Sequence, residues 1–276
     1  MTDAAAVSIR NVTKTFGKGG TTALQSIDLE FQPGEFISLI GPSGCGKSTL
    51  LRVIGDLIEP SEGEAVIGGK TAHQARLDRD YGMVFQAPVL FDWRSVEDNV
   101  KLPLEILGKD KAYRNKRAKE MLELVELGDF TKHMPYQLSG GMQQRVAIAR
   151  ALSFEPRILL MDEPFGALDE MTRERMNDEV LRIWQQTGTT VVFVTHSIPE
   201  AVYLSSRVVV MSARPGRITK IVDIDLPRPR DDASRETPRY FELITEVREA
   251  LRAGGGDVDD SGIPSAARTM AEGAVG

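Results

Sequence analysis

The segment that decides the fold of this chain is Gly41-Pro42-Ser43-Gly44-Cys45-Gly46-Lys47-Ser48-Thr49. From Gly41 to Ser48 it fits the phosphate-binding pattern G-x-x-x-x-G-K-[ST] at every fixed position. In this pattern the glycines let backbone N–H groups close around phosphate oxygens, the lysine adds a positive charge, and the serine hydroxyl can bind Mg²⁺. Residues 36–40 form an apolar run typical of a buried strand, and residues 49–54 have a helical pattern. The segment therefore predicts a nucleotide-binding loop between a strand and a helix.

A second glycine-rich segment is Leu138-Ser139-Gly140-Gly141-Met142-Gln143-Gln144-Arg145. It combines polar side chains and flexible glycines at the predicted start of a helix. The N-terminus of a helix presents N–H groups without intrahelical partners and a partial positive charge, which together favour an anion. The chain therefore contains two separate segments suited to phosphate.

Composition narrows the classes of protein to which the chain can belong. Its 276 residues suffice for one large domain or two small ones. The net charge is −6, which disfavours a protein that binds nucleic acid. Cys45 is the only cysteine, so no intramolecular disulfide can form and a reducing compartment suits the chain. The histidines at positions 73, 133 and 196 lack the spacing of metal ligands.

The sequence also bears on membrane association. Residues 1–8 include an early acidic residue and no long apolar core, so we expect no signal peptide there. No apolar stretch approaches the roughly 18 residues that a membrane-spanning helix requires. Any role at a membrane is therefore expected to depend on a partner protein.

The order of predicted elements indicates an α/β fold. Short strands and turns in the first forty residues predict an antiparallel β layer. The pattern becomes helical and highly charged from residue 105 to residue 127. Continuous apolar runs at 158–161 and 190–195, with a helix predicted at 171–187 between them, are typical of buried parallel strands. We therefore predict an α/β core with a helical insertion.

The C-terminal part has a different character. Residues 226–230, Leu-Pro-Arg-Pro-Arg, predict an extended linker. A last helix follows, and Tyr240, Phe241, Ile244, Val247 and Leu251 are predicted to share one face of it. Residues from 254 onward lack aromatic side chains and are rich in Gly, Ala and Asp, which predicts a disordered tail. The predicted domains are 7–225, with a helical subdomain at about 88–150, then 226–252, and a tail at 253–276.

Polar residues at predicted strand ends are candidates for chemistry. Asp162 and Glu163 follow the strand at 158–161, where an Asp can hold Mg²⁺ and a Glu can activate a water. The alternative is a surface Asp-Glu-Pro turn. Gln86 and His196 also follow predicted strands, and ligands of open α/β sheets bind at the carboxyl ends of strands. A lone histidine is more often structural, so each of these two residues is a weak candidate by itself.

Taken in order along the chain, these motifs resemble the nucleotide-binding subunit of an ABC transporter. The resemblance covers about residues 7–220. It rests on Phe16, residues 41–49, Gln86, residues 138–145, residues 160–163, residues 167–169 and His196. It implies a P-loop NTPase core with an antiparallel β subdomain and a helical subdomain. It departs from the commonest motif at Met142, where Gln is usual, and at Phe16, where Tyr is usual, and both changes are conservative.

The resemblance implies that this chain binds and hydrolyses ATP with Mg²⁺. By this likeness Phe16 stacks on adenine, and residues 41–49 bind the phosphates. Mg²⁺ and its waters would be held by Ser48, Gln86 and Asp162. Glu163 would be the general base, and His196 would contact the γ-phosphate.

The resemblance also implies a head-to-tail homodimer. Ser139, Gly140 and Gly141 of one subunit would contact the γ-phosphate of ATP bound to the other, and Asp169 would link the two sites. Such a pair has a self-complementary two-fold interface.

The likeness extends to a subfamily and to partners. Residues 92–100, 211–218 and 226–230 resemble importers of nitrate, sulfonate, taurine or pyrimidine precursors. The implied partners are transmembrane permease subunits and a solute-binding protein, and the implied location is the cytoplasmic face of the cell membrane. One alternative is an ABC-type ATPase that acts on DNA or the ribosome, although this chain lacks the long coiled-coil insertion or second ATPase half of those proteins. Another is a catalytically inactive regulatory subunit.

Overall fold

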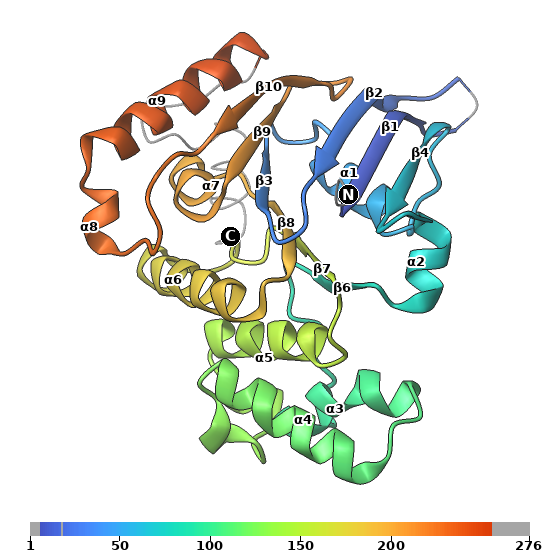
Figure 1. Ribbon diagram of the computed structural model, residues 1–276, viewed down its shortest axis with the longest axis vertical. Helices are drawn as coiled ribbons and strands as arrows, with labels where there is room; N and C mark the ends of the chain where they lie inside the picture. The colour runs from blue at the N-terminus through green and yellow to red at the C-terminus, as the bar shows by residue number, and fades with distance from the viewer. Residues whose placement is uncertain (1–5, 18, 256–276) are drawn as a thin grey trace, which may run out of the picture. The chain divides into compact units, whose positions relative to one another are not determined.

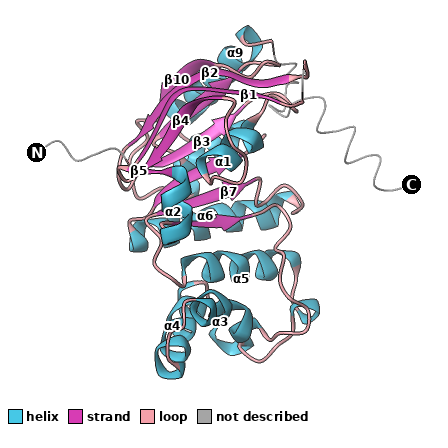
Figure 2. Ribbon diagram, turned by 90° about the vertical axis from the view of Figure 1, so that its right-hand side faces the viewer, coloured by secondary structure: helices cyan, strands magenta, loops and turns pink. Residues whose placement is uncertain are grey.

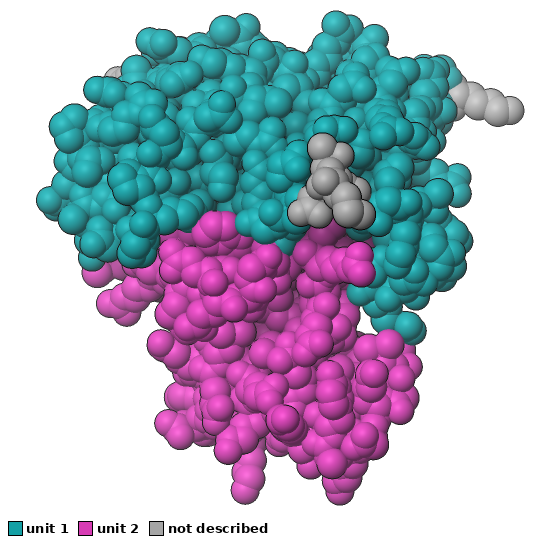
Figure 3. All heavy atoms as spheres, in the orientation of Figure 1, with its two compact units in different colours: residues 1–80, 190–276 teal, residues 81–189 magenta. Residues whose placement is uncertain are grey.

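The computed structural model describes residues 6–17 and 19–255, and the chain divides into two compact units (Figure 3). Unit 1 comprises Met1–Asp80 and Thr190–Gly276, and unit 2 comprises Tyr81–Thr189. The elements of unit 1 are β1 (Val7–Thr15), β2 (Thr22–Phe31), β3 (Phe36–Ile40), α1 (Lys47–Ile54), β4 (Glu62–Ile67), β5 (Lys70–Thr71), α2 (Ala72–Asp78), β8 (Thr190–Val194), α7 (Ile198–Leu204), β9 (Arg207–Met211), β10 (Ile218–Asp223), α8 (Asp232–Arg235) and α9 (Pro238–Ala253).

Unit 1 begins with the antiparallel layer that the sequence predicts. Its strands lie in the order β2-β1-β4-β5, and Figure 1 shows β1 between β2 and β4. In β1, Val7, Ile9 and Val12 are buried. β1 pairs with β2 on one side and with β4 on the other, with Val7 opposite both Phe31 and Ile67.

Unit 1 also contains strands in the order β10-β9-β3-β8. Strand β3 is parallel to both β8 and β9, and all five of its residues are buried. A strand covered on both faces reads as a continuous apolar run, which is why residues 36–40 predicted it correctly. The phosphate-binding segment follows this central strand directly.

Unit 2 contains two parallel strands and its own group of helices. The elements are β6 (Tyr81–Val84), α3 (Val96–Ile106), α4 (Lys111–Leu124), the short 3₁₀ helices η1 (Gly128–Phe130) and η2 (Pro135–Gln137), α5 (Gly140–Leu152), β7 (Ile158–Asp162) and α6 (Glu170–Thr187). Strand β6 pairs in parallel with β7. Helices α3, α4 and α5 pack against one another (Figure 2). Helices α3 and α4 lie within the stretch at about 88–150 that we predict as a helical subdomain, and α5 begins in it and ends at Leu152.

The helical pattern predicted from residue 105 to residue 127 is interrupted. Helix α3 ends at Ile106, and Gly108 has φ +67°, a left-handed conformation that favours glycine. Asp110 then caps α4 by accepting a hydrogen bond from the N–H of Tyr113 at 2.9 Å. Only the last two residues of α3 lie in this stretch, so the predicted helical pattern corresponds mainly to α4.

The C-terminal helix α9 packs on α7, β9 and β10 of unit 1. Tyr240, Ile244, Val247 and Leu251 are buried, as predicted. Phe241, predicted on the same face, is instead 56 % exposed, and Leu243 is buried in its place. The predicted boundary at residue 252 lies one residue before the end of α9. Most of the predicted tail, residues 256–276, lies outside the described residues.

Candidate nucleotide-binding site

The phosphate-binding segment forms the turn between β3 and α1. Gly46 is the N-cap of α1 with φ +103°, and Gly44 has φ +71°. The first N–H groups of any helix lack intrahelical partners, and the left-handed glycines fold the loop over the start of α1. The turn therefore presents donors and a partial positive charge to an anion. The backbone is also closely packed at Gly41, where a Cβ atom would lie 2.9 Å from the Met211 carbonyl oxygen. The structure therefore shows why glycines occupy these positions.

We predict that Gly46→Ala weakens ATP binding and lowers stability. A Cβ atom there would lie 2.8 Å from Leu24 Cδ2 and 2.9 Å from the Ala23 carbonyl oxygen, in addition to the strain of a positive φ. Left-handed strain alone is expected to lower the free energy of unfolding by about 1–3 kcal/mol. Gly69→Ala is the control, because Gly69 has φ +80° with nothing within 4 Å of a Cβ atom. Denaturant titration and a nucleotide-binding assay should show a larger loss for Gly46→Ala, and equal effects would contradict the prediction.

Lys47 is the charged residue of the loop. Its ammonium group donates to the carbonyl oxygens of Gly41 at 2.8 Å and Pro42 at 3.1 Å, and the side chain is 5 % exposed. Burial also raises the pKa of the neighbouring Cys45 thiol, so this thiol contributes no negative charge to the loop at neutral pH. The interior of the loop therefore holds one cation and no ionised thiol, which suits a phosphate group.

His196 lies at the same sheet edge as the loop. Strand β8 is parallel to β3, with Val194 opposite Leu39. Gly41 follows Leu39 by two residues and His196 follows Val194 by two residues, so both leave the sheet at corresponding positions. The structure thus brings His196 and the loop to the carboxyl ends of two neighbouring strands, where α/β sheets bind ligands.

Phe16, the predicted adenine contact, immediately follows β1 in unit 1. Its side chain is 44 % exposed, and the Lys14 ammonium group lies 5.3 Å from the ring centroid. An exposed aromatic ring is available for stacking on a planar base. Stacking on adenine remains a prediction.

In unit 2, Gln86 and Glu163 are brought together. Val84 lies opposite Met161 in the parallel pair β6 and β7, and Gln86 and Glu163 each follow two residues later. A Cβ atom at Gly166 would lie 3.2 Å from Gln86 Nε2 and 3.7 Å from Glu163 Oε2, so both side chains reach the same small volume. Asp162, the last residue of β7, is 7 % exposed. An amide and two carboxylates thus gather at one strand edge.

The backbone of Glu163 is unusual. Its φ is +44°, in the left-handed region that residues with a Cβ atom rarely adopt. Such conformations persist where the surrounding structure holds them, and they concentrate at functional sites. The left-handed backbone of Glu163 is compatible with the predicted catalytic role, which stays a prediction.

The second glycine-rich segment begins α5, as predicted. Ser139 is the N-cap, and its hydroxyl accepts a hydrogen bond from the N–H of Met142 at 3.3 Å. Gly140 and Gly141 allow close packing, because their Cβ atoms would lie 3.4 Å from Leu168 Cδ2 and 3.0 Å from Thr172 Cγ2. Ser139 and Gly141 also line an open cavity of about 550 Å³. The start of this helix is therefore accessible to a ligand.

Asp169 caps the neighbouring helix α6. Its carboxylate accepts a hydrogen bond from the N–H of Thr172 at 3.0 Å, and this bond lowers the pKa of Asp169. Since Thr172 also packs against Gly141, the structure connects Asp169 to the start of α5 within unit 2. The predicted role of Asp169 between two nucleotide sites is compatible with this position.

Two residues that position the segment around Gln86 were missed as functional from the sequence. Gln144 is 1 % exposed, and its amide donates to the Phe85 carbonyl oxygen at 3.0 Å. The Arg150 guanidinium donates to the carbonyl oxygens of Val89 at 2.8 Å and Pro88 at 3.0 Å. Helix α5 therefore holds the backbone on both sides of Gln86. The sequence feature that could have indicated this role is the presence of long polar side chains on the face of α5 that packs against the protein.

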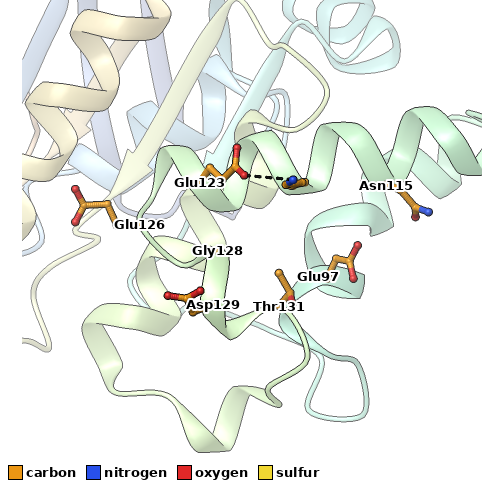
Figure 4. A pocket seen from close by; sticks show the side chains of 8 residues that line it. Glu97, Asn115, Glu123, Glu126, Gly128, Asp129 and Thr131 are labelled. Carbon is orange, nitrogen blue, oxygen red and sulfur yellow. Dashed lines mark ion pairs between the residues drawn. The ribbon is translucent and has the colours of Figure 1, made fainter.

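Another cavity of unit 2 is unsuited to phosphate. Its volume is about 800 Å³, and four of its eight lining residues are acidic (Figure 4). The lining residues are Glu97, Asn115, Lys119, Glu123, Glu126, Gly128, Asp129 and Thr131. Its lysine already forms an ion pair with Glu123 at 3.8 Å. Repulsion between carboxylates and phosphate directs a nucleotide away from this cavity.

Each unit has an oxygen donor suited to Mg²⁺ that is bound mainly by a nucleotide. Among the described residues, no group of three or more His, Cys, Asp or Glu side chains forms a metal cage. Mg²⁺ bound with nucleotide phosphates needs only one or two protein oxygen ligands and keeps several waters. The Ser48 hydroxyl, in the first turn of α1, and the Asp162 carboxylate are oxygen donors of this kind.

Comparison with known proteins agrees with this chemistry. The family model "ABC transporter" matches residues 24–166. An uncharacterised ABC transporter ATP-binding protein of Methanocaldococcus jannaschii is 51 % identical over 243 residues, covering 87 % of this chain and 90 % of that protein. The aliphatic sulfonates import ATP-binding protein SsuB of Bacillus cereus is 45 % identical over 251 residues, which cover 90 % of this chain and 97 % of SsuB.

Solved structures show the same fold. A dimeric structure of MJ0796, a bacterial ABC transporter cassette, has a TM-score of 0.69 and 39 % identity, covering 79 % of this chain and 98 % of that one. The structure of cbiO1 from Clostridium perfringens, part of the ABC transporter complex cbiONQ, has a TM-score of 0.75 and 26 % identity. The match covers 91 % of this chain and 98 % of cbiO1. The α/β fold predicted from the sequence is confirmed. With a family model that matches more than half of its length and relatives this similar, the chain belongs to the ABC transporter ATP-binding proteins.

Proposed function

We propose that this protein is the ATPase subunit of an ABC importer, and that it dimerises on ATP and drives transport by hydrolysing it. The observation that carries the proposal is the convergence of Gln86 and Glu163 at one strand edge, in a chain with an intact phosphate loop. Hydrolysis is further supported by a relative, the cassette MJ0796, whose structure has been solved in a post-hydrolysis state with ADP and Pi.

The chemistry follows from the residues of each unit. The loop N–H groups and Lys47 bind the phosphates. Ser48 and Asp162 would hold Mg²⁺, which would balance part of the negative charge of the phosphates. Glu163 accepts a proton from water as the water oxygen bonds to the γ-phosphorus. The bond between this phosphorus and the bridging oxygen of ADP then breaks. Gln86 orients the water, and His196 donates a hydrogen bond to the γ-phosphate.

The second copy of the chain completes the site in this proposal. Ser139 and Gly141 of one copy contact the γ-phosphate bound to the other, and Asp169 links the two sites. The accessible start of α5 supports this role, as does the dimeric structure of the relative MJ0796. Hydrolysis removes the bridging phosphate, so the pair reopens.

The segment that follows Gln86 is the proposed contact with the permease. Trp93 is 74 % exposed and Val89 is 57 % exposed with φ +48°. Arg150 holds the backbone of this segment, as described above, so the exposed side chains are presented in a defined position. Exposed apolar side chains held in this way are typical of protein interaction sites. Among the described residues, no helix is both long and apolar enough to cross a membrane.

We predict that Trp93→Ser removes permease binding while the isolated protein keeps its ATPase activity. A buried Trp at an interface typically contributes about 2 kcal/mol or more, so affinity should fall at least roughly 30-fold. Phe241→Ser is the control, because Phe241 is also exposed but lies on α9. Co-purification from detergent-solubilised membranes measures binding, and equal binding by Trp93→Ser and the unaltered protein would remove this segment from the interface.

The proposed cargo class is nitrate, a sulfonate, taurine or a related small solute. It is supported by the SsuB relative, which is similar over nearly its whole length. In this proposal the protein lies at the cytoplasmic face of the membrane through its permease, in a complex with a solute-binding protein.

The test of this proposal is to identify the permease and the solute-binding protein that co-purify with this protein. Co-purification with nucleic acid or ribosomes would instead favour the alternative ATPase class, and absence of ATPase activity would favour an inactive subunit.

A further inference from the structure

We infer that Arg230, in the segment after the ATPase fold, is a positioning residue for His196 and acts through helix α7. The inference rests on the proposed function, because His196 is assigned there to the γ-phosphate. Its basis is a set of hydrogen bonds within unit 1 that connects the two ends of α7.

The first observation concerns the backbone carbonyl groups at the C-terminal end of α7, which accept hydrogen bonds from two arginines. The last four carbonyl groups at a helix end lack intrahelical partners. Arg230 Nη1 donates to the carbonyl oxygens of Val202 at 3.2 Å, Tyr203 at 2.6 Å and Ser205 at 2.8 Å. Arg228 Nη2 donates to the remaining one, Leu204, at 2.9 Å. Two arginines therefore supply donors to all four carbonyls, and their charges oppose the negative end of the helix dipole.

The second observation is that this arrangement buries charge. Arg230 is 7 % exposed, and within residues 6–17 and 19–255 its Nε has no hydrogen-bond partner. Burial, together with the charge of Arg228, lowers the pKa of Arg230 to about 9. Burying two like charges is unfavourable unless specific partners compensate. The bonds to α7 provide this compensation, so they constrain the position of the helix end strongly.

The third observation is that α7 connects this end to His196. The helix has seven residues, and its N-cap Ser197 directly follows His196. The turn is held by the Ser197 N–H, which donates to Thr195 Oγ1 at 3.0 Å, and by a hydrogen bond from Thr195 to Glu200. At the other end, Ser205 Oγ donates to Ser38 Oγ at 2.5 Å, on the strand that leads to the phosphate loop. A short helix fixed in this way transmits a displacement of its C-terminal end to His196.

Other contacts of the C-terminal segment support the same helix. The Arg235 guanidinium lies 3.6 Å from the centroid of the Tyr203 ring, and the Tyr240 hydroxyl donates to the Pro199 carbonyl oxygen at 3.2 Å. The segment predicted as a linker at residues 226–230 therefore contributes specific contacts to the ATPase fold.

The test is Arg230→Gln, assayed for steady-state ATP hydrolysis and for equilibrium ATP binding. We expect kcat to fall roughly 10- to 100-fold, as for a small misplacement of a catalytic group, while the Kd for ATP stays unchanged. Arg230→Lys should restore part of the activity, because one ammonium group replaces some of the donors of the guanidinium. Arg239→Gln is the matched control. Arg239 lies in the same C-terminal segment, but it donates hydrogen bonds to the carboxylates of Asp225 and Glu242. The Arg239→Gln variant should therefore keep a normal kcat.

A double-mutant cycle with His196→Ala separates positioning from a general loss of structure. If Arg230 acts through His196, adding Arg230→Gln to His196→Ala lowers kcat no further. An equal further loss in that background, or normal kcat for Arg230→Gln alone, overturns the inference. Should Arg230→Gln fail to fold, as judged by thermal unfolding, the same cycle is run with Arg230→Lys. Normal kcat for His196→Ala alone would instead contradict the proposed role of His196 itself, and with it the inference.

Discussion

Glu163→Gln is expected to leave ATP binding intact and to lower the rate of hydrolysis by about 10²- to 10⁴-fold, the usual contribution of a general base. The amide has nearly the same shape as the carboxylate but cannot accept the proton of the attacking water. Because the γ-phosphate then persists, the dimer should persist as well. Steady-state hydrolysis and gel filtration with ATP measure the two effects.

Glu155→Gln is the matched control for this substitution. Glu155 also lies in unit 2 and has a left-handed backbone, with φ +59°, but its exposed side chain pairs with Arg117. This variant should hydrolyse ATP at the normal rate. If Glu163→Gln hydrolysed ATP nearly as fast as the control, Glu163 would be removed from the mechanism.

Lys47→Ala is expected to lose nucleotide binding itself. A hydrogen bond to a charged group contributes about 1.5–3 kcal/mol, so the Kd for ATP should rise at least about tenfold. The ammonium group lies inside the loop, bonded to the Gly41 and Pro42 carbonyl oxygens, and no other residue of 41–49 is cationic. The Arg214 guanidinium, which also touches the loop, is already bonded to the Gly44 carbonyl oxygen at 2.8 Å. Titration with a fluorescent ATP analogue measures the change.

Lys220→Ala provides the control for charge. Lys220 lies on β10 of the same unit and pairs with Glu246 at 2.8 Å. Its removal changes the net charge equally and should leave the Kd unchanged. Tight binding by Lys47→Ala would contradict the assignment of residues 41–49 as the phosphate loop.

Much of the site was predictable because its determinants are local. A loop that closes around phosphate needs glycines at particular positions, and Gly44 and Gly46 do adopt left-handed conformations. Residues that follow parallel strands reach the same sheet edge. The equal offsets of Gln86 and Glu163 from paired residues of β6 and β7 illustrate this directly.

The sequence-based predictions were wrong or incomplete where contacts with residues distant in sequence determine which side chains are buried or hydrogen-bonded. Phe241 and Leu243 are both apolar, and the packing of α9 against α7 and the β9–β10 hairpin determines which of them is buried. The sequence places Gln144 in the second glycine-rich motif and Arg230 in a predicted linker, and it predicts no positioning role for either. Their importance depends on backbone carbonyls that lie 59 and 27 residues away, at Phe85 and Tyr203.

The sequence by itself therefore determined the fold class, the family and the candidate chemistry, because short motifs encode backbone conformation and the types of functional group. Only the tertiary structure decided which other polar residues hold the functional side chains of the candidate site in position. Hydrogen bonds to backbone carbonyls make this selection, and every residue has a carbonyl, so no side-chain pattern identifies the one that a buried arginine or glutamine will reach.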